Sequence, residues 1–217
     1  MSKLVGKDWL NSSHKRAEDL FLTAAMLPVS IPALLVASAA IIAVDHVNPY
    51  FSQGRLGEND EPFIMRKLRT MPGVTEHITS SGFFDGRRSK LGGFLAKTRT
   101  DEAPQFWNVL MGDMSIVGYR ALIEGDYERG QKILDSVDYE EMRRIRFLSK
   151  PGLIHLFGMR HPGTDFSTEK EAWQTRFHTE REYFMTASRQ LDHEIMLGCA
   201  KVATQLFKLK PNEDLAA

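Results

Sequence analysis

A long apolar stretch without any charged side chain occupies residues 20–44 (LFLTAAMLPVSIPALLVASAAIIAV). A helix needs roughly 20 apolar residues to cross a bilayer, whereas the apolar core of a signal peptide has only about 7–15. We therefore expect this stretch to enter a membrane as a helix, which makes the lipid bilayer one partner of the protein.

Two prolines interrupt the first half of this stretch, where Pro28 and Pro32 flank Ser30. A proline inside a helix removes a backbone donor and clashes with the carbonyl four residues earlier, so we expect a break near residues 28–32. Two shapes fit this break. One is a bent helix that spans the bilayer. The other is a re-entrant helix that leaves on the side where it entered, with the freed carbonyls bonded by the side chain of Ser30 or Thr23. The charges before the stretch cancel, so they do not choose between the two.

The composition limits the remaining choices. The chain has 217 residues, enough for one main domain. Its 28 Lys and Arg residues equal its 28 Asp and Glu residues, so no basic excess favours a nucleic-acid partner. The one cysteine, Cys199, excludes an intrachain disulfide framework and a cysteine-rich metal site, which is typical of the reducing cytosol.

The rest of the chain predicts an α+β fold that is mostly helical, with a small β-hairpin and interfacial amphipathic helices. We expect residues 1–19 to lie at the membrane interface with Trp9 at headgroup level, a disordered tail being the alternative. Turn residues at 57–60 separate two strands of the hairpin. The further expectations are a loop at 73–90, short helices within 90–111, helical periodicity at 121–147, a break at Pro151-Gly152, a loop at 158–168, and helices at 168–188 and 191–208. We expect the last helix to lie on the membrane or to pack beneath the apolar segment.

A carboxylate pair, Asp101 and Glu102, stands just before Pro104. Proline is tolerated in the first turn of a helix, so we expect a helix to begin within 100–102 and to place both carboxylates at its positive end. Capping is the ordinary reason for acids there. The same position stabilises phosphate and would keep the carboxylates ionised. A set of cations favours a phosphate and metal site over capping alone: Lys67, Arg69, Lys97, Arg99 and Arg120.

Three segments, taken in order, carry a family resemblance. QGRLGENDEPFIMRKLRTM, then LGGFLAKTRTDEAPQFWNVLMGDMSIVGYR, then PGL resemble the bacterial sugar transferases, the monotopic polyprenyl-phosphate phosphoglycosyl transferases. The matched positions are Gln53, Arg55, Gly57, Lys67, Arg69, Thr70, Met71, Asp101, Glu102, Gln105, Asn108, Val109, Gly112, Asp113, Met114 and Ser115. The resemblance covers residues 18–208.

The resemblance implies a re-entrant N-terminal helix and a catalytic domain on the cytoplasmic face of the inner (cytoplasmic) membrane. Family members break this helix at a Ser-Pro pair, where this chain has Ser30-Ile31-Pro32. The domains expected on this basis are an interfacial segment at 1–19, a re-entrant helix at 20–45 broken near 28–32, a catalytic domain at 46–208 and a tail at 209–217.

The resemblance also implies a reaction in two covalent steps. Asp101 would attack the β-phosphate of a UDP-sugar and release UMP. A membrane polyprenyl phosphate (undecaprenyl phosphate) would then take the phosphosugar and initiate surface glycan synthesis. Asp101 and Glu102 would hold Mg²⁺. The substrate- or phosphate-binding residues would be Lys67, Arg69, Lys97, Arg99, Arg120 and Glu180.

This chain departs from the family pattern in four places. Gly118-Tyr119-Arg120-Ala121 replaces G-P-R-P, and Ala96 replaces a basic residue. PGLIHLFGMRHPG keeps Pro151 and Gly152 but loses the middle of its motif, and Glu180 stands for an aspartate. A catalytically silent, membrane-anchored relative that binds lipid or partner enzymes is therefore the alternative hypothesis. A homo-oligomer is compatible with the sequence, and none of these motifs specifies the sugar.

Overall fold

The computed structural model describes residues 6–73, 88–164 and 166–208. The α-helices are α1 (Lys7–Leu10), α2 (Ser13–Asp45), α3 (Lys90–Lys97), α4 (Gln105–Met111), α5 (Glu124–Ile133), α6 (Ser136–Arg146), α7 (Leu156–Arg160), α8 (Glu169–Thr186) and α9 (Arg189–Lys208). The strands are β1 (Tyr50–Leu56), β2 (Pro62–Leu68), β3 (Ser115–Val117), β4 (Tyr119–Arg120) and β5 (Pro151–Ile154). This mostly helical α+β architecture confirms the predicted class. Most of the loop predicted at 73–90, and the tail at 209–217, lie outside the described residues.

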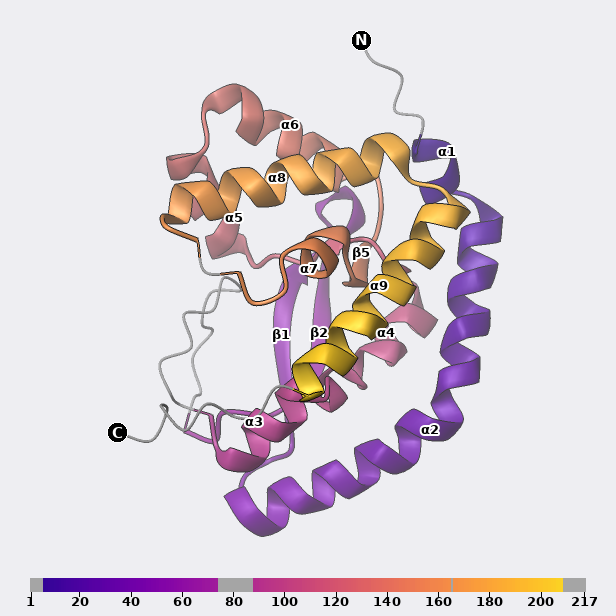
Figure 1. Cartoon of the computed structure of the whole chain (residues 1–217), viewed down its shortest axis with the longest axis vertical. Helices are drawn as coiled ribbons and strands as arrows, with labels where there is room; N and C mark the ends of the chain where they lie inside the picture. Colours follow the sequence, from indigo (N-terminus) through magenta and orange to yellow (C-terminus); the bar gives the residue numbers. More distant parts are fainter. Residues whose placement is uncertain (1–5, 74–87, 165, 209–217) are drawn as a thin grey trace.

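The apolar segment forms one long helix, α2, which is longer than the predicted segment because it starts at Ser13. Ser12 caps its N-terminus by accepting a hydrogen bond from the backbone N–H of Lys15 (3.1 Å). The helix continues through Pro28 and Pro32 and changes direction along its length, so that it curves around one side of the molecule (Figure 1). The predicted break therefore takes the form of a bend within a continuous helix.

The polar side chains near the bend do not take the partners we expected. The two prolines free the carbonyls of Ala24 and Pro28. The Ser30 hydroxyl instead donates to the carbonyl of Leu27 (3.4 Å). Thr23 Oγ1 is buried without a hydrogen-bond partner among the described residues.

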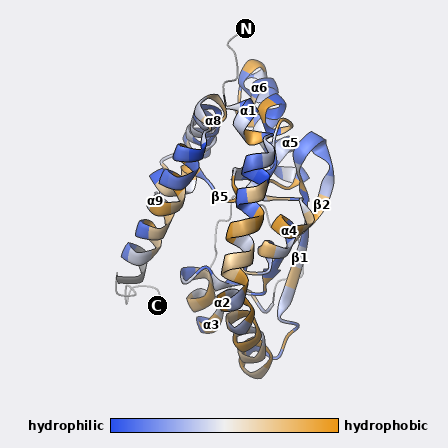
Figure 2. Ribbon diagram, turned by 90° about the vertical axis from the view of Figure 1, so that its right-hand side faces the viewer, coloured by the Kyte–Doolittle hydropathy of each residue, from blue (hydrophilic) through white to orange (hydrophobic). Residues whose placement is uncertain are grey.

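The middle of α2 presents large apolar side chains outward. Phe21, Val29, Leu35 and Val36 are 72%, 68%, 63% and 71% exposed. The apolar colouring of Figure 2 continues along this part of α2. Water penalises so much exposed apolar surface, and one helix of this length and composition is consistent with membrane association.

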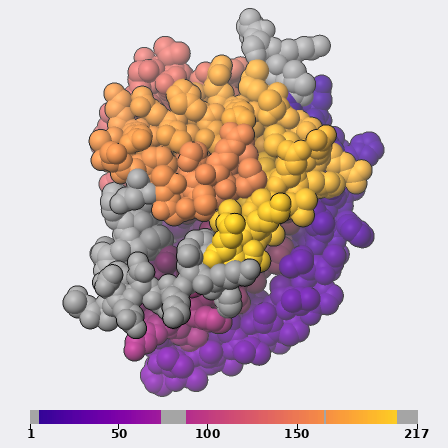
Figure 3. All heavy atoms as spheres, in the orientation of Figure 1, coloured from indigo at the N-terminus to yellow at the C-terminus, as the bar shows by residue number. Residues whose placement is uncertain are grey.

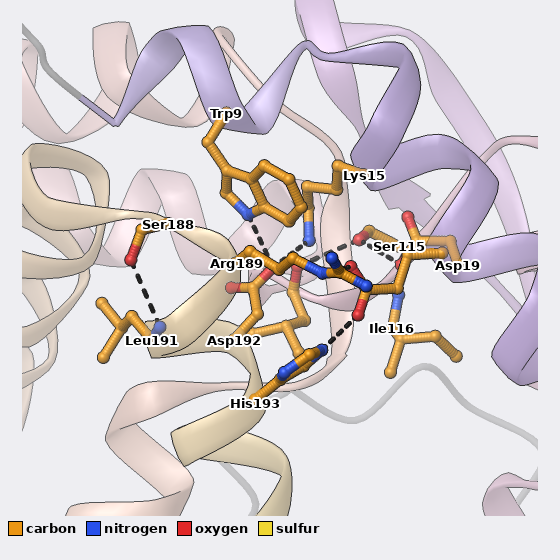
Figure 4. Close-up of polar contacts among 12 residues, drawn as sticks. Trp9, Lys15, Asp19, Ser115, Ile116, Ser188, Arg189, Leu191, Asp192 and His193 are labelled. Atoms are coloured by element: carbon orange, nitrogen blue, oxygen red, sulfur yellow. Dashed lines mark hydrogen bonds and ion pairs between the residues drawn. The ribbon is translucent and has the colours of Figure 1, made fainter.

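The N-terminal end of α2 is attached to the body of the protein by a buried ion pair. Lys15 Nζ lies 2.6 Å from Asp192 Oδ2 on α9, and both side chains are 6% exposed. The Trp9 indole also donates to this carboxylate (2.9 Å), and the Tyr183 hydroxyl donates to its other oxygen (2.7 Å). Trp9 therefore packs against the body of the protein (Figure 4), and its place at headgroup level stays a prediction.

A second contact fixes the next turn of α2. Asp19 Oδ1 accepts hydrogen bonds from the Ser115 hydroxyl (3.0 Å) and from the backbone N–H of Ile116 (2.9 Å) on β3 (Figure 4). These polar contacts pair every buried charge near the N-terminal end of α2 with a partner, as burial requires.

The C-terminal end of α2 is attached by apolar packing. Ala37 and Ile41 form a buried cluster with Leu68 at the end of β2 and Leu95 on α3. The two ends of α2 therefore pack on the same globular body.

The predicted β-hairpin is present, with its turn at the predicted residues. β1 pairs antiparallel with β2 from Tyr50↔Leu68 to Leu56↔Pro62. A 3-10 helix at Glu58–Asp60 makes the turn, with Asn59 in the left-handed region at φ 56°. Phe63 and Met65 point from β2 into the main core.

A three-stranded parallel sheet, in the order β3-β5-β4, has no counterpart in the sequence predictions. Pro151-Gly152 was expected to break the chain, but it begins the central strand β5. This is possible because Gly118 and Gly152 allow a close approach of two backbones. A Cβ on Gly152 would lie 2.1 Å from the Gly118 nitrogen.

The last helices cover one face of the molecule. α8 and α9 form the upper face in Figure 3, and α2 follows its edge. Figure 2 shows α9 and α2 diverging away from the α1 end of the molecule. The predicted helices at 168–188 and 191–208 are confirmed as α8 and α9. The predicted helical region at 121–147 divides into α5 and α6, and α7 occupies part of the loop predicted at 158–168.

The buried pair at the start of α2 gives a stability prediction. Asp192→Asn leaves the Lys15 ammonium buried without its countercharge, and we expect the free energy of unfolding to fall by about 3 kcal/mol. Glu182→Gln is the matched control, because it breaks an ion pair with Arg160 whose side chains are 46% and 42% exposed. The control should cost less than about 1 kcal/mol. Denaturant unfolding of both variants in detergent measures the difference, and equal losses would contradict the assignment.

Candidate active site

The hairpin and α4 are joined by one buried amide, which fixes the position of the end of β2. Asn108 donates from Nδ2 to the Ile64 carbonyl (2.7 Å) and accepts at Oδ1 from the Arg66 backbone (3.3 Å). The same Nδ2 donates to Asp113 Oδ2 (3.0 Å), so this carboxylate supports the amide. Lys67, the next residue on β2, is thereby held over the turn that precedes α4.

That turn carries Asp101 and Glu102. It is a 3-10 helix (Thr100–Glu102) entered through Arg99, whose φ of 59° is left-handed. Pro104 stands immediately before α4, which begins only at Gln105. A helical turn therefore begins at Thr100, within the predicted residues 100–102, but it is a 3-10 turn, and the α-helix itself begins one turn later. The helix dipole consequently acts on the two carboxylates less than we expected.

Glu102 is surrounded by cations. Its Oε1 lies 3.4 Å from Lys67 Nζ and 3.1 Å from Arg99 Nη1. Burial alone would raise the pKa of this carboxyl, but Lys67, Arg99 and Arg120 together hold it below its ordinary value. Glu102 is therefore the ionised member of the pair.

Asp101 behaves in the opposite way. Burial, together with the negative charge of Glu102, raises its pKa to about 6, although Lys67, Arg99 and Arg88 act against this rise. Asp101 is therefore harder to ionise than an ordinary aspartate, although a pKa of about 6 still leaves it mostly ionised at neutral pH. Its Oδ1 is buried without a hydrogen-bond partner among the described residues. Such an oxygen can coordinate a metal ion or attack an electrophilic atom of a substrate.

A cavity of about 540 Å³ lies between this turn and α2. Its polar end includes Glu102, Arg99 and Arg120. Its apolar walls come from the bend of α2, from Leu153 and Ile154 of β5, and from the C-terminal half of α9. One cavity thus combines a charged end with apolar walls, one of which is the helix whose composition is consistent with membrane association.

Comparison with known proteins identifies the family. The sequence pattern described as "Bacterial sugar transferase" matches residues 10–205. The chain belongs to the bacterial sugar transferase family. The exopolysaccharide production protein PSS of Rhizobium leguminosarum bv. phaseoli is similar, with 31% identity over 192 residues, covering 85% of this chain and 92% of that protein.

Other relatives carry names that state a reaction. A UDP-N-acetylgalactosamine-undecaprenyl-phosphate N-acetylgalactosaminephosphotransferase of Aeromonas hydrophila is 36% identical over 196 residues, covering 88% of this chain and 43% of that protein. A UDP-glucose:undecaprenyl-phosphate glucose-1-phosphate transferase of Klebsiella pneumoniae is 34% identical over 129 residues, covering 54% of this chain. This sugar transferase matches only 28% of the length of the Klebsiella protein.

The predicted cations of the sugar transferase lie in different places. Lys97, Arg99 and Arg120 line the cavity together with Glu102, and Lys67 contacts Glu102. Arg69 instead donates to the backbone carbonyls of Asn48 (3.0 Å) and Tyr50 (3.4 Å), at the start of the hairpin. The structure thus joins four of the five predicted cations to the carboxylate turn.

Glu180 pairs with a buried arginine in this structure, and its predicted part in substrate binding stays a prediction. It is 3% exposed on α8 and forms a buried ion pair with Arg146 of α6. Arg146 also donates to the Arg120 carbonyl (3.0 Å) and lies over the Tyr119 ring at 4.8 Å. Glu180 therefore supports the backbone that carries Arg120. Sequence reasoning missed Arg146, because nothing in its helical pattern distinguishes a buried arginine from a surface one.

His155 is a further cavity residue to which the sequence analysis gave no role. It follows β5 and caps α7, and its Nδ1 accepts from the Gly158 N–H (2.8 Å). Burial, and then the charges of Arg120, Arg176, Arg99 and Arg146, hold its pKa well below its usual value. The only sequence signal was its place in the altered segment after Pro151-Gly152.

Two substitutions should move the pKa of Asp101 in opposite directions. Lys67→Met removes a cation that lowers this pKa, so we expect the midpoint to rise above about 6. Glu102→Gln removes the repelling charge and should bring the midpoint below about 6. Carboxyl-carbon NMR of the sugar transferase, titrated in EDTA, measures both shifts. A shift in the same direction for both variants would contradict the electrostatic arrangement.

Proposed function

We propose that this chain transfers a phosphosugar from a UDP-sugar to a membrane polyprenyl phosphate, of which undecaprenyl phosphate is the example in its relatives' names, and releases UMP. The observation that carries this proposal is the cavity that runs from Glu102 and Arg120 to the apolar residues of α2 and α9. A reaction between a soluble nucleotide and a lipid needs one site that both can reach.

Asp101 acts as the nucleophile in two steps. In the first, its carboxylate oxygen attacks the β-phosphorus of the UDP-sugar. A new bond forms between phosphorus and the carboxylate oxygen, and the bond to the bridging oxygen breaks, so that UMP leaves. In the second, a phosphate oxygen of the lipid attacks the same phosphorus, which restores the Asp101 carboxylate and gives a polyprenyl-diphosphate sugar. Splitting the transfer lets two dissimilar substrates use the site in turn.

The cations around the turn serve this chemistry. Lys67 and Arg99 hold Glu102 ionised, while Arg99, Arg120 and Lys97 face the cavity. Positive side chains already in position stabilise the charge that develops on phosphate oxygens in the transition state.

Magnesium fits this pair of carboxylates. Mg²⁺ prefers oxygen ligands and often binds one or two carboxylates together with substrate phosphates. Asp101 Oδ1, which lacks a partner among the described residues, is a suitable ligand, and Glu102 adjoins it. When bound there, the ion would supply positive charge to the diphosphate. The described residues contain no cluster of three or more His, Cys, Asp or Glu side chains that could hold a metal alone, which agrees with a site completed by the substrate.

We also propose that α2 is re-entrant and that the catalytic domain faces the cytoplasm at the inner membrane. Two observations support this. The N-terminal end of α2 binds Asp192 and Ser115, and its C-terminal end packs on Leu68 and Leu95. A helix whose two ends pack on one folded body cannot place those ends on opposite sides of a bilayer. UDP-sugars are cytosolic, so the body lies on that side.

Covalent trapping tests the reaction. Purified protein with Mg²⁺ and a panel of UDP-sugars labelled in the β-phosphate should release UMP and retain label in the absence of lipid. Asp101→Asn should abolish the retained label and lower turnover by at least about a thousandfold, as expected for loss of a nucleophile. Asp60→Asn is the matched control, because it makes the same change of carboxylate to amide in a partly exposed ion pair with Arg143 at the hairpin turn. An Asp101→Asn protein as active as the parent would overturn the proposal, and a parent that releases no UMP would favour a catalytically silent, lipid-binding relative.

Cysteine accessibility tests the path of α2. In a Cys199→Ser background, single cysteines at His14 and His46, both exposed near the helix ends, should react with a membrane-impermeant maleimide from the same side. We expect labelling in inverted membrane vesicles and none in intact spheroplasts. Reaction of the two positions from opposite sides would show a spanning helix and refute the re-entrant path.

A further inference from the structure

The end of the parallel sheet brings His155 to the cavity. β4 ends at Arg120, and β5, its parallel neighbour, ends at Ile154, immediately before His155. Ligands of parallel sheets bind at the carboxyl ends of the strands. Both Arg120 and His155 line the cavity between the Glu102 turn and the membrane helix.

The hydrogen bonding of His155 defines which of its nitrogens carries the proton. Nδ1 accepts from the Gly158 N–H (2.8 Å), so a neutral ring must carry its proton on Nε2. The four arginines that surround the ring disfavour a second proton. Nε2 has no hydrogen-bond partner among the residues that the structure describes, and it therefore remains as a donor for a ligand.

The ring is also held in place. A Cβ on Gly158 would come within 2.7 Å of His155 Cε1 and 3.0 Å of Nδ1. Glycine at this position therefore makes room for the imidazole directly above the first turn of α7. On its other side the ring packs against Phe157, with 6.4 Å between centroids. A donor fixed in this way loses little conformational entropy when it binds.

The cavity walls indicate which ligand approaches this donor. The residues on the apolar side are Met26, Val29 and Ala33 of α2 and Ala200, Val202 and Ala203 of α9. An acceptor with a long apolar chain can lie between these two helices, with its phosphate toward Arg120 and Glu102. A neutral N–H donor suits that phosphate, because it orients the oxygens while withdrawing less charge from the attacking oxygen than a further cation would.

We propose that His155 binds the phosphate of the lipid acceptor through Nε2–H and positions it for the second step. This inference rests on the proposed phosphosugar transfer. It assigns a lipid-phosphate ligand in the segment where this chain departs from the family pattern. Arg120, at the neighbouring strand end, supplies the charge that attracts the phosphate, and His155 sets its orientation.

The substitution His155→Asn separates the two roles of this side chain, which are to cap α7 through Nδ1 and to donate to the ligand through Nε2. In His155→Asn the Oδ1 atom can still accept from the Gly158 N–H, because asparagine is among the best N-cap residues, but the Nε2 donor is gone. With polyprenyl phosphate we expect kcat/KM for the lipid to fall by roughly 10- to 100-fold, the usual loss for a hydrogen bond to a charged group. The burst of UMP released without lipid should keep its rate within about twofold, because that step uses only the nucleotide sugar.

Two further measurements distinguish a loss of lipid-phosphate binding from a general loss of folding in the variant. Farnesyl phosphate, titrated calorimetrically into the full-length protein, should bind the variant at least about tenfold more weakly than the parent. Gly158→Ala displaces the ring and should reproduce the lipid defect in the parent, yet add little to His155→Asn. Additive effects of the two substitutions would indicate that Gly158 acts without His155.

The outcomes distinguish the inference from the function on which it rests. A parent without a UMP burst defeats the proposed function itself. A normal parent burst, with an equal loss of the burst and of the lipid step in His155→Asn, would assign the histidine to the nucleotide sugar and overturn the inference. Unchanged lipid kinetics and unchanged farnesyl phosphate binding would overturn it as well.

Discussion

The attachment of α2 at both of its ends is the constraint on which the rest of the structure depends. A buried ion pair between Lys15 and Asp192 holds the first end, and apolar packing of Ile41 on Leu68 holds the second. Between them the helix changes direction near Pro28 and Pro32, which permit the bend because each removes one backbone hydrogen bond. In this part of the helix the apolar side chains of Val29, Leu35 and Val36 are exposed.

The bend also creates the cavity. Because α2 and α9 are tied together near Asp192 and diverge beyond it (Figure 2), their facing apolar residues do not close on each other. Thr100 and Glu102 of the carboxylate turn line the polar end of this space, and the hairpin positions the turn through Asn108 and Lys67. The membrane anchor and the candidate chemistry are therefore parts of one arrangement. Loosening the Lys15–Asp192 pair should disturb the cavity as well as the stability of the fold, because the same helix forms one of its walls.

Short-range sequence patterns correctly predicted the elements that depend on neighbouring residues in the chain. The hairpin followed from alternating residues around a turn at 57–60, and α8 and α9 from helical periodicity. The carboxylate pair and most of its cations were recognisable from their order along the chain. The parallel sheet was missed because β3, β4 and β5 are very short and pair over a long sequence separation, made possible by the close backbone approach at Gly118 and Gly152. The partnership of Glu180 with Arg146 was missed for a related reason. Burial of a charged side chain depends on how α6 and α8 pack, and neither helix signals it by itself.

The difference between the two adjacent carboxylates bears on how a nucleophile of this kind works. Glu102 forms ion pairs with the nearest cations, which lower its pKa. Asp101 is buried beside the negative charge of Glu102, and both effects raise the pKa of Asp101 to about 6. Relative to the ordinary value of 3.8, this favours the protonated acid by about 3 kcal/mol. A cation held beside Oδ1 would recover part of that free energy by offsetting the charge of the carboxylate. Burial therefore makes Asp101 costly to ionise, and positive charge brought close to Oδ1 would favour its ionised form. In the proposed two-step transfer this dependence would make the carboxylate most favourable at the step that forms the covalent bond.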